Sequence, residues 1–458
     1  MILDKKYNWI YFSLGAIILL IPAFSNNYPF VYSDTGAYIN TGFTNTVPND
    51  RPIFYGWFLR HMSLKQTFWL PVFMQSLMIF FYIHLFVKYF SKVFYKKAFT
   101  LILTLFLTFT TGIGLFSGKL MPDIFTPIII LSVYFLIFAD KISKTEKIII
   151  SIIFYYALMV HISHLLIIFL TVLSAVVYLI YKYRRNFSIA ITRFRKFLLI
   201  LFITGLSGLT IPSVNYLNYG TFEMTKGNHV FFMARLADSG ILKKYLDENC
   251  KEANYSLCQY KDEIPTSAVG FIWYESSPFY KTGGWIESKE EYNRLIKDIF
   301  SDSRYWKFLI FDFTKQTFKQ FFTFSPGTII SHRENTPPFW EIENKMKHEL
   351  NEYRNSTQFV QGYDISFLER RQLFLFYFSL VIIIICLFTT YFYSANTFGV
   401  KGIVFLLLML FINAFVCGAL ANVVDRLQGR VVWIIPVIAL ITCVNYLAEN
   451  KFPQLKKP

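Results

Sequence analysis

Long apolar stretches constrain this chain more than any other feature of its sequence. They cover residues 9–24, 68–86, 99–116, 124–139, 148–160, 165–181, 197–211, 373–392, 402–420 and 431–447. Several of them reach the ~20 residues that an α-helix needs to cross ~30 Å of hydrocarbon. The shorter stretches reach that length when flanking residues such as Ser151, Thr210 and Asn215 are included. We therefore predict an all-α polytopic membrane protein with about ten transmembrane helices.

The charged residues support this fold class and exclude nucleic acid as a partner. Only 16% of the 458 residues are charged, whereas about a quarter is usual in soluble proteins. The basic residues occupy alternate connections between the apolar stretches: Lys5 and Lys6; Lys88, Lys92, Lys96 and Lys97; Lys141, Lys144 and Lys147; Lys182, Arg184, Arg185, Arg193, Arg195 and Lys196; Lys401; and Lys456 and Lys457. Membrane proteins show this pattern on their cytoplasmic side. The net charge of +16 therefore reflects topology, and both termini are expected in the cytoplasm.

The first apolar stretch is expected to remain in the protein as a helix. Pro22 and Phe24 follow it, in place of the small residues of a signal-peptide cleavage site. The short loops and the lack of targeting segments indicate the bacterial cytoplasmic (inner) membrane. We expect a multi-pass protein surrounded by membrane lipids.

The predicted topology divides the chain into three parts. Residues 1–211 form a transmembrane module whose first outer loop covers 25–66, residues 212–371 form a mostly helical extracytoplasmic segment between spans seven and eight, and residues 372–458 form the C-terminal transmembrane helices. In the large segment, aromatic residues of 306–324 recur at three- and four-residue steps. This pattern fits a helix on the bilayer surface and equally a half-buried helix of the outer domain.

The cysteines fall into two groups. Cys386, Cys417 and Cys443 lie in apolar stretches and are expected to be packing residues. Cys250 and Cys258 lie in the large outer segment, where a disulfide is chemically permitted. These two residues are the disulfide candidate.

Polar residues capable of chemistry gather beside helix ends on the outer side. Asp34 lies in the first outer loop, within Ser-Asp-Thr-Gly-Ala-Tyr. The others on that side are Arg51, Lys119, Asp123, His161, His164, Asp425, Arg426 and Arg430. A carboxylate can take the proton of an acceptor hydroxyl or hold a divalent metal, and arginine and lysine can neutralise a phosphate. A reaction that releases a lipid phosphate needs these groups.

Each of these residues also has a structural interpretation that the sequence leaves open. Asp123 follows a proline at a helix start, where a negative charge suits the helix dipole, and Asp34 fits the cap of a loop helix. The histidines fit interfacial positions without a ligand, and the two last arginines fit partners of Asp425. The chain contains no metal motif, phosphate-binding glycine loop or serine-hydrolase elbow, so the sequence gives those classes no support.

The order of the motifs resembles that of GT-C glycosyltransferases, a family that includes protein O-mannosyltransferases and aminoarabinose transferases. The loop with Asp34 is followed by Arg51-Pro52-Ile53-Phe54, where the family has a His-Pro-Pro-Leu-like helix. Met121-Pro122-Asp123 resembles the family's Pro-Asp/Glu motif, and residues 426–436 resemble its Arg-Tyr…Pro ending. The resemblance covers mainly residues 7–170. The family's usual acidic pair is a single Asp34 here, which leaves open whether a divalent metal such as Mg or Mn takes part.

The resemblance implies a glycosyltransferase that moves a sugar from a polyprenyl-phosphate carrier to an extracytoplasmic acceptor, a cell-envelope glycan or lipid, with inversion at the anomeric carbon. In this interpretation Asp34 and Asp123 are the catalytic carboxylates, Arg51, Lys119, Arg426 and Arg430 bind the carrier phosphate, and His161 and His164 line the cleft.

Two other functions stay open. One is a polymerase or ligase of lipid-linked oligosaccharides, which would not need Asp34. The other is a transporter or flippase of a lipid-linked substrate, although transporters usually carry ionisable or broken helices near mid-membrane.

Overall fold

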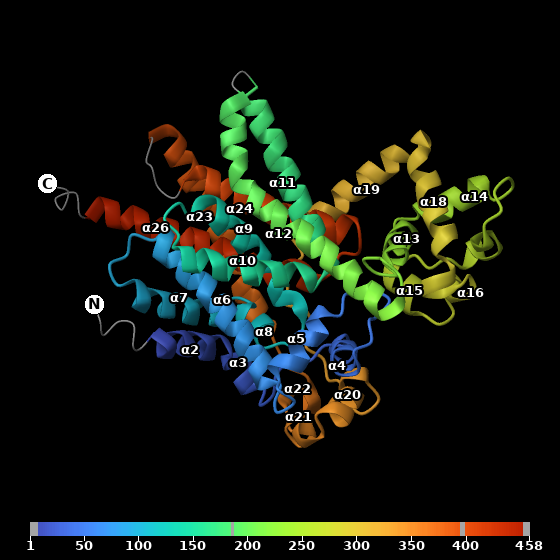
Figure 1. Ribbon diagram of the computed structural model, residues 1–458, viewed down its shortest axis with the longest axis horizontal. Helices are drawn as coiled ribbons and strands as arrows, with labels where there is room; N and C mark the ends of the chain where they lie inside the picture. The colour runs from blue at the N-terminus through green and yellow to red at the C-terminus, as the bar shows by residue number, and fades with distance from the viewer. Residues whose placement is uncertain (1–7, 185–186, 394–398, 452–458) are drawn as a thin grey trace.

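The structure is a computed structural model that describes residues 8–184, 187–393 and 399–451 (Figure 1). Within these ranges every regular element is a helix. Two isolated β-bridges also occur there, one between Phe30 and Lys119 and one between Ile329 and Tyr363. Among the cations assigned to the cytoplasmic side, Lys5, Lys6, Arg185, Lys456 and Lys457 lie outside the described residues.

Six helices of the described ranges are long and apolar enough to cross a membrane, as judged by length and composition. They are α6 (Trp69–Phe90), α11 (Ile162–Lys182), α12 (Phe187–Tyr219), α23 (Ser366–Tyr393), α24 (Val400–Ala414) continued by η4 (Phe415–Ala419), and α25 (Asp425–Val432) continued by α26 (Ile434–Lys451). The other four predicted stretches form shorter helices: α2 (Asn8–Leu19), α7 (Lys96–Thr110), α9 (Phe125–Phe138) and α10 (Lys144–Met159). The fold is thus that of a helical multi-pass membrane protein, and the number of ten spans stays a prediction.

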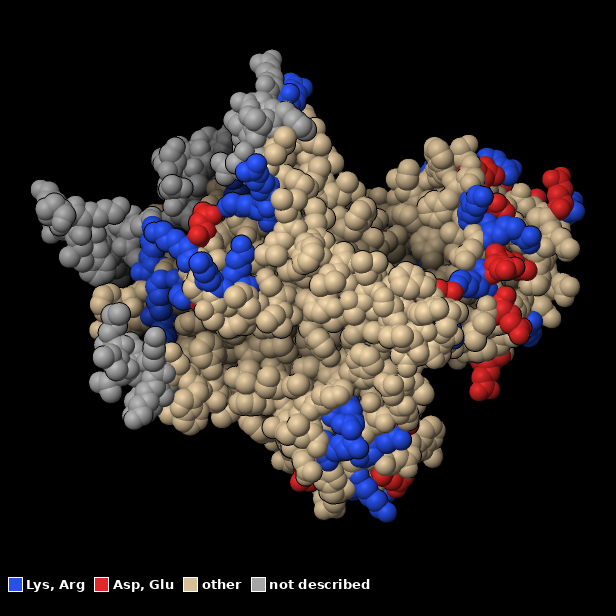
Figure 2. All heavy atoms as spheres, in the orientation of Figure 1, with Lys and Arg blue, Asp and Glu red and all other residues tan. Residues whose placement is uncertain are grey.

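The surface charges are distributed as expected for such a protein. In Figure 2, Lys and Arg gather at the end of the molecule where α2 begins and α26 ends, and acidic and basic residues mix on two protrusions. Most of the surface between these regions shows no charge. An uncharged surface of this breadth is suited to hydrocarbon.

Local sequence sets the start of two consecutive helices, α10 and α11. Ser143 caps α10: its hydroxyl accepts a hydrogen bond from the Glu146 amide while the Glu146 side chain accepts one from the Ser143 amide. The side chain of His161 caps α11 by accepting from the Ser163 amide at 3.2 Å. These caps satisfy amide groups that the first helical turn leaves without partners.

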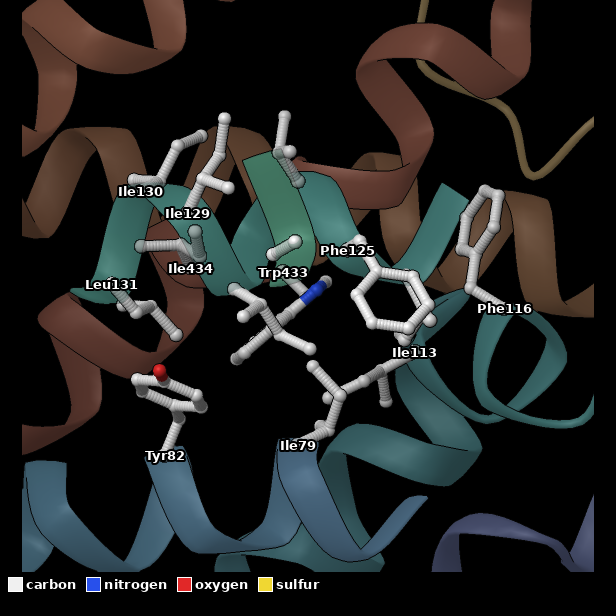
Figure 3. Close-up of a cluster of buried hydrophobic side chains, with 14 of the residues drawn as sticks. Ile79, Tyr82, Ile113, Phe116, Phe125, Ile129, Ile130, Leu131, Trp433 and Ile434 are labelled. Atoms are coloured by element: carbon white, nitrogen blue, oxygen red, sulfur yellow. The ribbon is translucent and has the colours of Figure 1, made fainter. Parts of the chain in front are cut away.

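The main core lies where α6, α8 (Ile113–Ser117), α9 and α26 meet (Figure 3). Trp433, between α25 and α26, is 1% exposed, and its indole N–H donates to the carbonyl of Arg430 at 3.0 Å. Figure 3 shows its ring among Ile113, Phe125 and Ile434. The indole thereby fixes the short helix α25 above the core.

The outer segment 212–371 consists of two parts with different cores. Helix α12 continues through Pro212 to Tyr219, so the expected domain boundary falls inside a helix. A first part has its own buried cluster and contains α13 (Asn228–Asp238), α14 (Ile241–Asn249), η2 (Ser256–Glu263), α15 (Ala268–Trp273), α16 (Pro278–Lys281), α17 (Gly284–Glu287) and α18 (Lys289–Ser301). We call it the distal lobe. It holds the disulfide between Cys250 and Cys258, which confirms that prediction.

The second part packs against the membrane helices and the first outer loop. It contains α20 (Pro337–Lys345), η3 (Lys347–Glu349), α21 (Leu350–Arg354) and α22 (Thr357–Gln361), and its apolar residues belong to the main core. Buried Glu349 accepts hydrogen bonds from the Tyr28 hydroxyl at 2.8 Å and the Phe68 amide at 3.1 Å. Gln358 bonds both the amide and the carbonyl of Val31. These contacts hold the first outer loop at both of its ends.

Helix α19 (Ser303–Phe321) joins the distal lobe to the membrane part (Figure 1). One face packs against η4, where a Cβ on Gly418 would lie 2.6 Å from Cβ of Gln320. Ile310 and Phe311 on another face are 65% and 70% exposed. An exposed apolar face favours a helix lying along the bilayer surface over one buried within the outer domain.

Candidate functional site

The first outer loop folds into two helices that carry part of the site. They are α4 (Thr35–Thr44) and α5 (Phe54–Met62). The two helices cross at Gly42 of α4 and Gly56 of α5, where a Cβ on Gly42 would lie 2.1 Å from the carbonyl oxygen of Gly56. This close approach fixes Asp34, before α4, relative to Arg51, before α5.

Asp34 is placed for an interaction with other side chains and not for helix capping. It precedes α4 but makes no side-chain cap hydrogen bond. Its carboxylate instead receives Nη2 of Arg51 and Nη2 of Arg426, each at 3.3 Å. The side chain keeps 27% exposure, so one carboxylate of the site stays open to a ligand.

Asp123 lies deeper, in the short 3-10 helix η1 (Pro122–Ile124). Its carboxylate accepts hydrogen bonds from Arg426 at 3.0 and 3.2 Å and from Arg430 at 3.1 Å. The side chains of Asp123 and Arg430 are each 1% exposed. A carboxylate that is buried and paired twice is suited to positioning the arginines, whereas a base needs access to its substrate.

Arg426 and Arg430 lie four residues apart on α25, on one helical face. Within the described residues neither arginine pairs with Asp425. The helix is held by the loop after α19: a Cβ on Gly429 would lie 2.4 Å from the carbonyl oxygen of Ser325. Because Arg426 contacts both Asp34 and Asp123, it connects the two carboxylates across the site.

Lys119 is the unusual cation of the cluster. The Phe30–Lys119 bridge holds its backbone, its side chain is buried, and Nζ has no hydrogen-bond partner among the described residues. The ammonium lies 5.0 Å from the ring centre of Phe116 and 5.7 Å from that of Tyr32. Burial lowers the pKa of Lys119 to about 8, against the raising effect of Asp123. A buried ammonium without hydrogen bonds is costly, so this position favours an anionic ligand.

The two histidines have different surroundings. Burial, with the nearby charge of Arg430, lowers the pKa of His161 to about 3, so its imidazole is neutral beside the cluster. His164 bonds Oγ1 of Thr126 at 2.9 Å and the carbonyl of Ala157 at 2.6 Å. Both nitrogens of His164 thus contact the protein, which gives it a packing role in place of the expected ligand contact.

Sequence reasoning missed three residues of this cluster. Asp50 pairs with Arg51 at 2.5 Å. Tyr32 lies with its ring centre 4.6 Å from the Arg426 guanidinium, and Tyr38 lies 4.9 Å from that of Arg51. For Tyr38 a signal was available, since it follows Asp34 by four residues at the start of a helix, a spacing that places two side chains on one helical face.

The cluster has two layers and an excess of positive charge. The outer layer of Asp34, Asp50, Arg51 and Arg426 is partly exposed, and the inner layer of Lys119, Asp123 and Arg430 is buried. Its four cations, Arg51, Lys119, Arg426 and Arg430, face three carboxylates. This balance suits an anion with one or two negative charges.

The donor set does not fit a resident divalent metal. Among the described residues no group of three or more His, Cys, Asp or Glu is placed to hold an ion. Both Asp34 and Asp123 already face guanidinium groups, with which a cation would compete. We derive no step through a metal.

No family model, curated protein or solved structure matches this chain.

Proposed function

We propose that this protein is a membrane-embedded glycosyltransferase of the GT-C type. It takes a sugar from a polyprenyl-phosphate carrier at the bacterial cytoplasmic membrane and passes it to an extracytoplasmic acceptor, a cell-envelope glycan or lipid. The observation that carries the proposal is the partly exposed carboxylate of Asp34 beside a cation cluster in which buried Lys119 has no hydrogen-bond partner within residues 8–184, 187–393 and 399–451.

The residues suit a single displacement at the anomeric carbon. The acceptor oxygen forms a bond to that carbon as the bond to the phosphate oxygen breaks, and the leaving phosphate takes the bonding electron pair. Asp34 takes the proton of the acceptor hydroxyl, since it is the more open of the two predicted catalytic carboxylates. Inversion follows from the family resemblance.

The cations suit the carrier phosphate. Arg51 and Arg426 offer planar N–H groups at the exposed layer, and Lys119 offers its ammonium below them. A phosphate that binds Arg426 competes with Asp34 for the same guanidinium. Binding of the donor would therefore release the carboxylate for its role as base.

Asp123 serves a different role from the one that the motif resemblance suggested. Its two arginine contacts and its burial make it the residue that holds Arg426 and Arg430 in place. Its removal would disturb the phosphate site and the fold together.

A transfer assay with Asp34→Asn tests the proposal, with Asp50→Asn as its matched control. Both carboxylates pair with Arg51, and Asp50 does so through the shorter contacts, at 2.5 and 2.8 Å against 3.3 Å for Asp34, so Asp50→Asn disturbs that arginine at least as much as Asp34→Asn does. Purified full-length proteins are incubated with radiolabelled polyprenyl-phosphate sugars and an envelope acceptor fraction. Loss of a general base lowers the rate by about 10²–10⁴-fold. We expect this loss with Asp34→Asn and a much smaller one with Asp50→Asn.

The other outcomes separate the alternatives. Equal loss in both variants would assign the effect to Arg51 and not to a base. Unchanged transfer in Asp34→Asn would favour the polymerase or ligase. No transfer by the wild type across the donors would contradict the proposal for those donors, and transport of the lipid-linked substrate would be measured next.

A further inference from the structure

A second feature lies on the membrane part, away from the catalytic cluster. A groove of about 590 Å³ runs between α10 and α12. Lys144, Lys147, Ile148 and Ile152 of α10 line one side, and Leu199 and Leu206 of α12 line the other. Residues Asp34, Asp123 and Arg426 are not part of its wall.

The groove is ordered from a charged end to an apolar end. Its α10 residues follow one helical face, with both lysines in the first turn and the isoleucines after them. From residue 144 to Tyr155 the helix rises by about 16 Å, which matches half of a ~30 Å hydrocarbon layer. Ile148 and Ile152 are 59% and 64% exposed, so the apolar part is open to the surroundings.

The lysines at the charged end have no carboxylate partners among the described residues. The nearby acids are already paired: Glu146 with Lys88 at 2.8 Å, and Asp140 with Lys196 at 2.7 Å. Two positive charges therefore remain at the mouth of the groove. Helix α10 begins on the side of the molecule where α2 begins and α26 ends (Figure 1).

We propose that this groove binds one anionic phospholipid. Its phosphate contacts Lys144 and Lys147, and one acyl chain lies along Ile148, Ile152 and Leu206. Apolar length and terminal charge together match a lipid of this class, whereas the phosphate of a zwitterionic lipid is already balanced by the cation of its own headgroup. The site belongs to the leaflet on the side where α2 begins and α26 ends, and it does not depend on the proposed glycosyl transfer.

Native mass spectrometry of the purified full-length protein tests this site. The protein is titrated with phosphatidylglycerol or phosphatidylcholine of identical acyl chains, and retained lipid is counted. One lysine near a membrane surface changes binding of an anionic lipid about fivefold. We expect wild type to prefer phosphatidylglycerol by about tenfold or more, and the double variant Lys144→Gln, Lys147→Gln to lose the preference.

Two further variants separate charge from groove shape. Lys141→Gln removes a charge from the same connection, outside the groove wall, and should keep the preference. Ile152→Trp fills the apolar part and should lower retention of both lipids.

The proposal is overturned if the double lysine variant retains phosphatidylglycerol as well as wild type does. It is equally overturned if Lys141→Gln lowers the preference for phosphatidylglycerol to the same degree, because that result would show a general charge effect. A dimer that Ile152→Trp dissociates would also overturn it, because a second copy of the chain would then cover the groove. Binding is read without any transfer reaction, so its failure and that of the proposed enzyme activity are distinguishable.

Discussion

Replacing Asp123 by asparagine tests whether charge holds the inner layer of the site together. The carboxylate is 1% exposed and accepts three hydrogen bonds of 3.0–3.2 Å from Arg426 and Arg430. Asparagine keeps the size of the side chain but offers one acceptor oxygen, and its amide group donates toward a guanidinium that also donates. Arg430, itself 1% exposed, then stays buried without its anion.

Removing one partner of a buried ion pair costs about 3–5 kcal/mol. In domains of 150–250 residues, each kcal/mol lowers Tm by about 2–4 °C, and the shift is smaller in larger proteins. We therefore expect Asp123→Asn to lower Tm by roughly 6–10 °C. Intrinsic tryptophan fluorescence during heating in detergent measures this shift.

Asp34→Asn is the matched comparison, because Asp34 contacts the same Arg426. Its two ion pairs are longer, at 3.3 Å, and the side chain is 27% exposed. Partly exposed pairs contribute about 0–1 kcal/mol each, so the loss of both should lower Tm by no more than about 4 °C. Equal stability of the two variants would refute the assigned positioning role of Asp123. A stable Asp123→Asn protein without transfer activity would make Asp123 a catalytic group.

Three further predictions concern packing and pH. Gly36→Ala should lower Tm by several degrees, because the added Cβ would lie 2.5 Å from the carbonyl carbon of Pro337. Gly205→Ala is the control and should not lower Tm, because in the described part of the chain its added Cβ would have no neighbouring element within 4 Å. Burial lowers the pKa of His161 from 6.5 to about 3, so the unfolded chain takes up a proton first as pH falls. The contribution of His161 to stability should therefore be complete above pH 6.5 and decline toward pH 3. The variant His161→Gln should show a smaller fall in Tm between pH 7.5 and pH 5 than wild type does. Lys119 loses its charge as pH rises through its pKa of about 8, so KM for the donor should rise above that pH in wild type, and Lys119→Met should have a high KM without this pH dependence.

The sequence by itself determined the helical membrane character of the protein and the segments that carry the site. Apolar length and the positions of lysine and arginine are local properties, since a span must be apolar along its own length. Cys250 and Cys258, eight residues apart, were likewise found in the sequence as the disulfide candidate, and the structure shows the bond. The two-part nature of segment 212–371 was not predictable in this way, because it depends on which core each helix joins.

Only the tertiary structure decided which polar residues meet and which of them stay accessible. Arg426 reaches Asp123 and Asp34 across 303 and 392 residues, and no local pattern specifies such a contact. Burial separated residue types that look equivalent in the sequence: Asp34 is open while Asp123 is enclosed, and Lys119 has no hydrogen-bond partner in the described part of the chain while Arg430 is paired. The ionic and chemical character of these groups follows from how completely packing removes water around them, which is a property of the whole fold.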